Sequence, residues 1–340
     1  MNILVTRLSA LGDVAMMIPV VSSIALRYPE HHFTVVSMPL VAPLLKGHAN
    51  IDFVAFEKRS THKGFKGIFK LFCQLRKMRR FDCVVDLHDV LRTKILGSLF
   101  RVMGTKLLVI DKGRTEKKEL TEKGHLQSVQ LTSSIERYRV VFSSLGLTIG
   151  SINSSLPFEG LTSREPIYAA FGTKSGKWIG IAPFSQHIGK QLPFNKIETI
   201  IDYFSQQNDI RIFLFGAGEK ERQLIDDWKQ KYPKTESVVG KLPFDTELLL
   251  MKELDVMLTM DSGNMHLASL VGTPVVSVWG ATHPYAGFYG MNQPEGNAIQ
   301  LPLACRPCSI FGNIPCKFGT YECLNAIESK DIVEKMATYL

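Results

Sequence analysis

Residues 256–274, which read Val-Met-Leu-Thr-Met-Asp-Ser-Gly-Asn-Met-His-Leu-Ala-Ser-Leu-Val-Gly-Thr-Pro, decide the fold class. They begin with a short apolar run, continue through a polar turn that contains glycine, and lead through a helix-length segment to a second run at Val275–Trp279. Both runs are almost continuously apolar, which is typical of strands covered on both faces, as in parallel sheets. The stretch therefore predicts a strand–helix–strand unit of an α/β domain.

The same alternation extends along the whole chain. The other expected strands are Ile3–Thr6, Phe33–Ser37, Asp52–Phe56, Cys83–Leu87, Leu107–Ile110, Trp178–Ala182, Arg211–Phe215 and Ser237–Val239, with helix-length segments such as Val14–Tyr28 and Lys196–Gln207 between strands. This pattern predicts two doubly wound, Rossmann-like α/β domains. Ligands of such sheets bind beyond the carboxyl ends of the strands, and two facing sheets would enclose an interdomain cleft.

Residues Gly146–Glu165 are rich in Gly, Ser, Asn and Pro and are expected to form a loop region, so we place the link between the domains near residues 150–175. We therefore expect an N-terminal domain over residues 1–160 and a C-terminal domain over 161–325. A final helix is expected over 326–340, with Ser329 as its N-cap.

The formal net charge of +8 is concentrated in one basic segment. Lys58–Arg80 contains nine basic residues and no acidic one, and removing those nine charges leaves −1 for the remainder of the chain. No apolar run approaches the roughly 20 residues that span a bilayer, and the N-terminus lacks the features of a signal peptide. We therefore expect a cytoplasmic protein, or one that is peripheral to the inner membrane.

Phe65, Ile68, Phe69 and Phe72 recur in the basic segment at the spacing of an amphipathic helix. Three interpretations remain open: a surface helix resting on an anionic membrane leaflet, a flap that grips a phosphorylated acceptor, and a core-facing helix with a solvated basic face. No nucleic-acid-binding motif accompanies the charges, so nucleic acid is not an expected partner.

Polar turns follow two expected strands of the second half. Asp261-Ser262-Gly263-Asn264-Met265-His266 combines free backbone amides with the positive end of a helix dipole, which suits a phosphate or pyrophosphate. After Trp178–Ala182, Ser185 supplies a hydroxyl and Lys190 a mobile positive charge. Helix capping, an interior histidine and an ordinary polar loop are the structural alternatives.

Two further turns carry carboxylates. Phe215-Gly216-Ala217-Gly218-Glu219-Lys220-Glu221 allows a ligand to approach the backbone closely, and either Glu219 or Glu221 is spaced to hold a ribose diol. Arg7-Leu8-Ser9-Ala10-Leu11-Gly12-Asp13 follows the first strand, where Asp13 is either a catalytic carboxylate or a helix cap. The G-x-G-x-x-G, P-loop and nucleophile-elbow patterns are absent, and so is an Asp-x-Asp pair for a divalent cation.

These motifs together resemble the lipopolysaccharide heptosyltransferases of glycosyltransferase family nine, which have the GT-B fold. The resemblance covers nearly the whole chain and is carried by the Arg7–Asp13 turn, the Pro183–Lys190 loop, and Asp261–Ala268 leading to Gly272-Thr273-Pro274. It implies an inverting, metal-independent transfer of heptose from ADP-heptose to a phosphorylated, lipid-linked inner-core acceptor, with no cofactor. In that fold the final helix can cross back to the first domain.

The resemblance also implies roles for individual residues. Asp13 matches the general base, Ser185 and Lys190 the phosphate-binding loop, Ser262 and Gly263 the amide donors, and Asp261 and His266 the region of the donor sugar and diphosphate. Glu219 matches the ribose-binding carboxylate, although Glu221 is equally well spaced. Lys58, Arg59 and Lys63 are the expected acceptor-binding residues. Gln186 stands where a second hydroxyl residue would suit phosphate better, so another nucleotide sugar remains an alternative donor. A GT-B epimerase and a nucleotide-sugar-binding protein without transfer activity are further alternatives.

Four of the six cysteines form the series Cys305-x2-Cys308-x7-Cys316-x6-Cys323. Four thiolates at this spacing are able to hold a structural zinc ion, although the second pair is not a C-x2-C knuckle. Free buried thiols and reversible disulfides are the alternatives, so the site prediction includes no metal.

Overall fold

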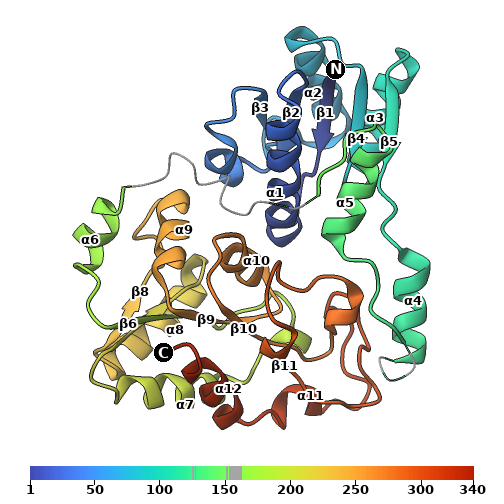
Figure 1. Cartoon of the computed structure of the whole chain (residues 1–340). Coiled ribbons are helices and arrows are strands. Elements are labelled where there is room, and N and C mark those ends of the chain that lie inside the picture. The colour runs from blue at the N-terminus through green and yellow to red at the C-terminus, as the bar shows by residue number, and fades with distance from the viewer. Residues whose placement is uncertain (125, 127, 151, 153–162) are drawn as a thin grey trace. The chain divides into compact units, whose positions relative to one another are not determined.

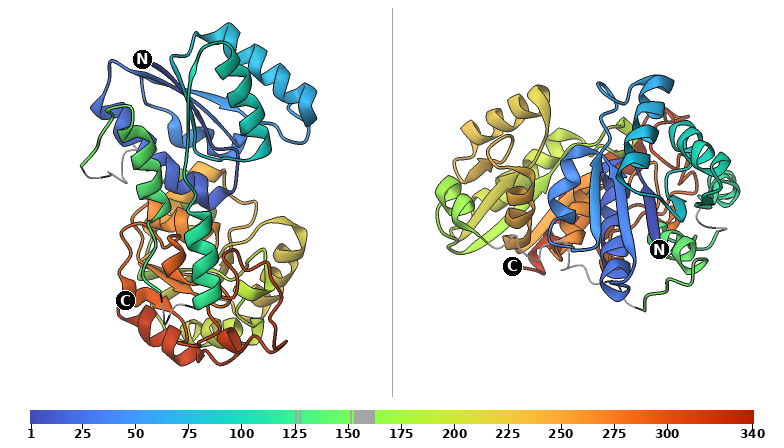
Figure 2. Two further views of the ribbon diagram at one scale, coloured as in Figure 1. Left: turned by 90° about the vertical axis from the view of Figure 1, so that its right-hand side faces the viewer. Right: turned by 90° about the horizontal axis from the view of Figure 1, so that it is seen from above.

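The computed structural model describes residues 1–124, 126, 128–150, 152 and 163–340. They form two compact units, one made of Met1–Gly113 and Ser133–Gly160, the other of Arg114–Thr132 and Leu161–Leu340 (Figure 1). Each unit contains one all-parallel sheet with helices on both sides (Figure 2). The prediction of two doubly wound α/β domains is confirmed.

The sheet of the first unit has the strand order β3-β2-β1-β4-β5. Its strands are β1 (Asn2–Thr6), β2 (His32–Ser37), β3 (Ile51–Ala55), β4 (Cys83–Asp86) and β5 (Lys106–Val109), and its helices are α1 (Leu11–Arg27), α2 (Gly64–Met78), α3 (Leu91–Val102) and α5 (Ser134–Ser143). Ile3, Leu4 and Val5 of the central strand β1 are all fully buried. Burial on both faces explains why this strand is apolar at successive positions.

Helices α2 and α3 cover one face of this sheet. Ile68 and Phe72 of α2 and Phe100 of α3 share one core with Leu4 and Val84 of the sheet. The rings of Phe72 and Phe100 meet edge to face, with centroids 4.9 Å apart. This aromatic contact fixes α2 against its neighbour and leaves the opposite face of α2 outward.

The sheet of the second unit has the strand order β11-β10-β9-β6-β7-β8. Its strands are β6 (Lys177–Ala182), β7 (Ile210–Leu214), β8 (Thr235–Ser237), β9 (Val256–Met260), β10 (Val275–Val278) and β11 (Ala298–Ile299). Its helices are α4 (Arg114–Lys123), α6 (Glu165–Phe171), α7 (Phe194–Ser205), α8 (Gly218–Lys231), α9 (Phe244–Glu253), α10 (Gly263–Leu270), α11 (Glu322–Asn325) and α12 (Ser329–Ala337). Nine of the ten predicted strands match an observed strand to within one residue at each end, and β11 was not predicted. The tenth, predicted at Ser237–Val239, shares only Ser237 with β8.

Two segments outside the expected C-terminal domain 161–325 group with the second unit. Arg114–Thr132 packs with the second unit, where the Leu131 amide donates to the Tyr285 carbonyl at 2.9 Å. The final helix α12 also belongs to the second unit, because its buried residues Ile332 and Met336 join that core. The expected boundary at residue 160 lies outside the described residues.

Helix α12 also begins one residue earlier than its predicted cap implies. Glu328 is the N-cap, whereas Ser329 is the first helical residue, and its hydroxyl donates to the Lys196 carbonyl at 3.2 Å. The Ser329 side chain therefore ties α12 to α7 and does not cap its own helix.

Candidate functional site

Asp13 lies in the first turn of α1, immediately beyond the central strand β1. Its carboxylate forms an ion pair with the Arg7 guanidinium at 2.5 Å and accepts the Ala10 amide at 3.4 Å. The Asp13 side chain is 27% exposed. The carboxylate is therefore fixed in position by neighbours on two sides and still accessible to a substrate hydroxyl.

Arg7 is the residue that the sequence analysis missed at this site. It is buried, it donates to the Leu87 carbonyl at 2.7 Å, and its guanidinium lies over the Tyr138 ring, 6.0 Å from the ring centre. The Tyr138 hydroxyl in turn donates to the Asp13 carbonyl at 3.3 Å. Arg7 thus orients the Asp13 carboxylate, and a basic residue at the end of a strand six positions before the candidate general base was the available signal.

His88 is the second polar residue beside this pair, at the end of β4. Its Nδ1 accepts the Leu8 amide at 3.2 Å, and the side chain is buried. Burial, reinforced by the positive charges of Arg7 and Lys112, lowers the pKa of His88 to about 3. The imidazole is therefore neutral at physiological pH, and Nε2 carries its proton.

Replacing His88 with asparagine is expected to reduce the loss of stability on acidification. The unfolded histidine titrates near pH 6.5, so below that pH the unfolded chain binds more protons and the free energy of unfolding falls as pH falls. The wild type should lose about 1 kcal/mol more than His88→Asn between pH 7.5 and 5.5. Amide hydrogen exchange of β1 measures this difference, with His31→Asn as the control. Equal losses in wild type and His88→Asn would contradict the burial argument.

The candidate acceptor residues Lys58, Arg59 and Lys63 lie between β3 and α2, and all three are exposed. The turn that carries them is held by Glu57, whose carboxylate accepts the hydroxyls of Ser60 at 2.8 Å and Thr61 at 2.7 Å. These hydrogen bonds hold the pKa of Glu57 below its usual range. Since β3 and β1 are parallel members of one sheet, the turn and Asp13 follow the same edge of that sheet.

In the second unit, Lys190 and Asp261 form an ion pair, with Nζ and Oδ2 3.1 Å apart. They follow β6 and β9, which are neighbours in the sheet, so the structure brings together two residues that the sequence separates by 71 positions. The stem of Lys190 lies against Gly312 so closely that a Cβ at Gly312 would come within 2.5 Å of Lys190 Cδ. The loop between Cys308 and Cys316, which contains Gly312, therefore limits where the Lys190 side chain can lie.

Ser185 and Ser262 contribute hydroxyls to the same edge of the sheet. Each Oγ is buried, and neither has a hydrogen-bond partner within the part of the chain that the structure describes. Ser262 is the N-cap of α10, and Gly263 is the first residue of the helix. Because the first amides of a helix lack intrahelical partners, this end of α10 is suited to an anion.

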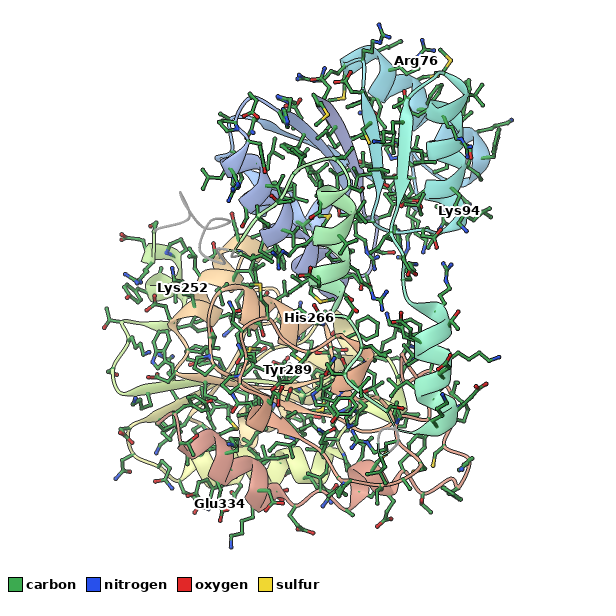
Figure 3. The ribbon with its side chains drawn as sticks, turned by 45° about the vertical axis from the view of Figure 1, so that its right-hand side comes forward. Arg76, Lys94, Lys252, His266, Tyr289 and Glu334 are labelled. Atoms are coloured by element: carbon green, nitrogen blue, oxygen red, sulfur yellow. The ribbon has the colours of Figure 1, made fainter. Side chains whose placement is uncertain are left out.

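His266 is buried on α10, one turn beyond Gly263 (Figure 3). The two glutamates that follow β7 differ in their contacts. Glu221 accepts the Ala217 amide at 2.7 Å and so caps the start of α8, whereas the Glu219 carboxylate is largely exposed, 3.8 Å from the Arg222 guanidinium. Of the two, Glu219 is the carboxylate available to a ligand.

A pocket of about 630 Å³ opens beyond β10 and β11, next to the Lys190–Asp261 site along the sheet edge. Its lining includes Gln130, His283, Tyr285, Tyr289 (labelled in Figure 3) and the buried Arg306. His283 Nδ1 accepts the Tyr285 amide at 3.1 Å. Sequence reasoning missed this pocket because its wall combines Gln130 with residues of the irregular stretch 283–306, although the polar and aromatic residues after Val275–Trp279 were a visible signal.

All six cysteines are free thiols. Burial raises the pKa of Cys323 to about 11 and raises that of Cys308, and the four C-terminal thiols lie close enough to affect one another electrostatically. Among the residues described, no group of three or more His, Cys, Asp or Glu side chains is placed to hold a metal ion. In the same residues, no helix is long and apolar enough to cross a membrane.

Known proteins with similar sequences and structures identify the family. The model of glycosyltransferase family 9 (heptosyltransferase) matches residues 68–313. The chain is 24% identical over 286 residues to the lipopolysaccharide core heptosyltransferase OpsX of Haemophilus influenzae, covering 83% of this chain and 80% of that protein. The family 9 glycosyltransferase of Veillonella parvula has a TM-score of 0.76 at 20% identity, covering 99% of this chain and 96% of that one.

Escherichia coli heptosyltransferase WaaC with ADP-2-deoxy-2-fluoro heptose superimposes with a TM-score of 0.70 at 18% identity, covering 98% of this chain and 99% of that one. These likenesses agree with the two parallel sheets described above. Because the family model matches well over half of the sequence, the chain belongs to glycosyltransferase family 9 and is a glycosyltransferase with the GT-B fold.

Proposed function

We propose that this glycosyltransferase moves a heptose from ADP-heptose to an inner-core lipopolysaccharide acceptor, with inversion and without a metal ion. The observation that carries the proposal is the group formed by the Lys190–Asp261 ion pair and the two buried hydroxyls of Ser185 and Ser262 at the edge of one sheet. A cation, hydroxyl donors and free helix amides are the groups that a leaving diphosphate requires. A heptosyltransferase of the same fold holds a fluorinated ADP-heptose.

The second unit supplies the donor site in this proposal. Lys190, with its ammonium held by Asp261, neutralises the diphosphate, and the amide end of α10 at Ser262 and Gly263 stabilises the charge that develops on the leaving ADP. Glu219 binds the ribose diol, because Glu221 is occupied in capping α8. Asp261, just before the start of α10, and His266, one turn into that helix, face the donor in this proposal.

The first unit supplies the base and the acceptor site. The Asp13 carboxylate takes the proton of the acceptor hydroxyl, the hydroxyl oxygen bonds to the anomeric carbon, and the bond from that carbon to the phosphate oxygen breaks with its electron pair passing to ADP. A single displacement of this kind inverts the anomeric centre. In this proposal the exposed residues Lys58, Arg59 and Lys63 bind phosphate groups of a lipid-linked acceptor, and the reaction takes place at the inner leaflet of the inner membrane.

The proposal is tested by incubating the protein with ADP-heptose in the presence and absence of core acceptor. We expect ADP release and a heptosylated product of inverted anomeric configuration only when both substrates are present, with EDTA having no effect. Conversion of the donor without an acceptor would indicate an epimerase, and ADP binding without any product would indicate a binding protein. Selective thermal stabilisation by ADP over UDP and GDP identifies the nucleotide.

Replacing Lys190 with methionine is expected to weaken ADP binding by about 10- to 100-fold, since the variant loses a charge-assisted hydrogen bond to phosphate. Methionine retains the apolar stem that lies against Gly312. Calorimetric titration with ADP gives the affinity, and the exposed Lys252 (Figure 3), replaced with methionine, is the matched control. Unchanged affinity in Lys190→Met would remove Lys190 from the donor site.

A further inference from the structure

Helix α2 exposes two phenylalanine side chains. Phe65 is 64% exposed and Phe69 48% exposed, and they lie one helical turn apart. The sequence analysis placed both on one apolar face with Ile68 and Phe72, but only the latter two are buried. The difference has a geometric reason: the buried stripe continues through Leu71 and Leu75, and Phe65 and Phe69 lie outside it, turned away from the sheet.

Cations without carboxylate partners surround these rings. Eight basic residues of the segment form no ion pair with any residue that the structure describes: Lys58, Arg59, Lys63, Lys66, Lys70, Arg76, Lys77 and Arg80. Arg79 pairs with Asp52 at 3.2 Å. By contrast, the exposed lysines of α4, Lys118 and Lys123, each pair with a glutamate four residues away. The two exposed α4 lysines are thus compensated within their own helix, whereas eight of the nine cations of the Lys58–Arg80 segment are not compensated by any carboxylate that the structure describes.

The surface is held in shape by packing beneath it. The His62 ring stacks on Phe56, with centroids 5.5 Å apart, and its Nδ1 accepts the Glu57 amide at 3.0 Å. The chain at His62 then passes so close to α2 that a Cβ at Gly67 would lie 2.3 Å from the His62 carbonyl carbon. The Phe72 ring supports Phe69 from below at 6.0 Å and lies under the Arg76 guanidinium, which projects from the outside of the first unit (Figure 3).

We propose that this outward face of α2 docks on an anionic lipid bilayer, with Phe65 and Phe69 inserted at headgroup depth and Lys66, Lys70 and Lys77 over the lipid phosphates. Charge complementarity selects this occupant, because an unpaired basic face with exposed aromatic rings matches an anionic interface that has an apolar interior. The inference rests on the proposed function in one respect: docking would bring the enzyme to a lipid-linked acceptor. The contact itself requires only the surface described.

The test is sedimentation of the full chain with vesicles of phosphatidylcholine alone and of phosphatidylcholine with 30% phosphatidylglycerol, an amount on the order of the anionic content of natural leaflets. We expect at least tenfold tighter binding to the anionic vesicles. Two double variants, Phe65→Ser with Phe69→Ser and Lys66→Glu with Lys70→Glu, should each lose about tenfold or more. The matched controls are Phe318→Ser, which is also 64% exposed, and Lys252→Glu with Lys330→Glu, which changes the net charge equally.

The rate of heptose transfer to a deacylated acceptor, measured without detergent, tests the chemical step independently of membrane docking. Both α2 double variants should retain the wild-type kcat on that substrate. The proposal is overturned if the wild type does not distinguish the two vesicle compositions, if the serine variant binds as the wild type does, or if the controls lose as much as the α2 variants. Vesicle binding by a chain that transfers no sugar would support docking and reject the proposed function, so the two failures are distinguishable.

Discussion

Replacing Asp13 with asparagine is expected to lower kcat by about 10²- to 10⁴-fold, the usual contribution of a general base. The change keeps the shape of the side chain and removes the proton-accepting charge. ADP affinity should stay within about twofold of wild type, because Asp13 belongs to the first unit and the proposed donor groups belong to the second. Initial rates at saturating donor and acceptor, with calorimetric titration of ADP, measure both quantities.

Two comparisons make the Asp13 result specific. Glu30→Gln removes an exposed carboxylate just beyond the other end of α1 and should leave kcat unchanged. Arg7→Lys keeps the positive charge but has a single ammonium in place of a planar fork, so it should lower kcat by less than Asp13→Asn does. A kcat within about threefold of wild type in Asp13→Asn would show that Asp13 is not the base.

The fold could be predicted from sequence because doubly wound sheets leave a strong signal. Buried parallel strands are apolar at successive positions, so runs such as Trp178–Ala182 and Val256–Thr259 stand out from the amphipathic helices between them. The strand β11 escaped detection because it has two residues and is only partly buried. The affiliation of Arg114–Thr132 escaped because it depends on contacts with residues near 285, which local patterns do not contain.

The candidate site was predictable only in part, for a related reason. Residues that follow strands, such as Asp13, Lys190 and Asp261, could be chosen because topology alone sends the ends of parallel strands to one edge. The side chains that contact these residues could not be identified from the sequence. The Arg7–Asp13 ion pair, the capping role of Glu221 and the outward direction of Phe65 depend on side-chain geometry that residue spacing leaves undetermined.

Arg306 is the residue whose loss should cost the second unit the most stability. It is fully buried, and its guanidinium donates to the carbonyls of Gly280 and Leu301 at 2.5 Å and of Thr282 at 2.8 Å. Burial lowers the pKa of Arg306 to about 10, so it remains charged at neutral pH. One side chain thereby supplies hydrogen-bond donors to backbone carbonyls of the loop that follows β10 and links that loop to the segment that begins at Cys305.

Arg306→Met is therefore expected to lower the free energy of unfolding by about 3–5 kcal/mol, because methionine fills part of the volume but leaves buried carbonyls without a donor. Urea unfolding followed by tryptophan fluorescence reports on this unit, since Trp178, Trp228 and Trp279 all lie in it. Arg222→Met, at a half-exposed guanidinium, is the control and should lower the free energy of unfolding by less than 1 kcal/mol.

The ADP affinity of Arg306→Met should also fall, because the loop that Arg306 holds includes Ala281, whose amide donates to the Gly189 carbonyl beside Lys190 at 2.7 Å. A loss below about 1 kcal/mol in Arg306→Met would mean that the loop finds other donors.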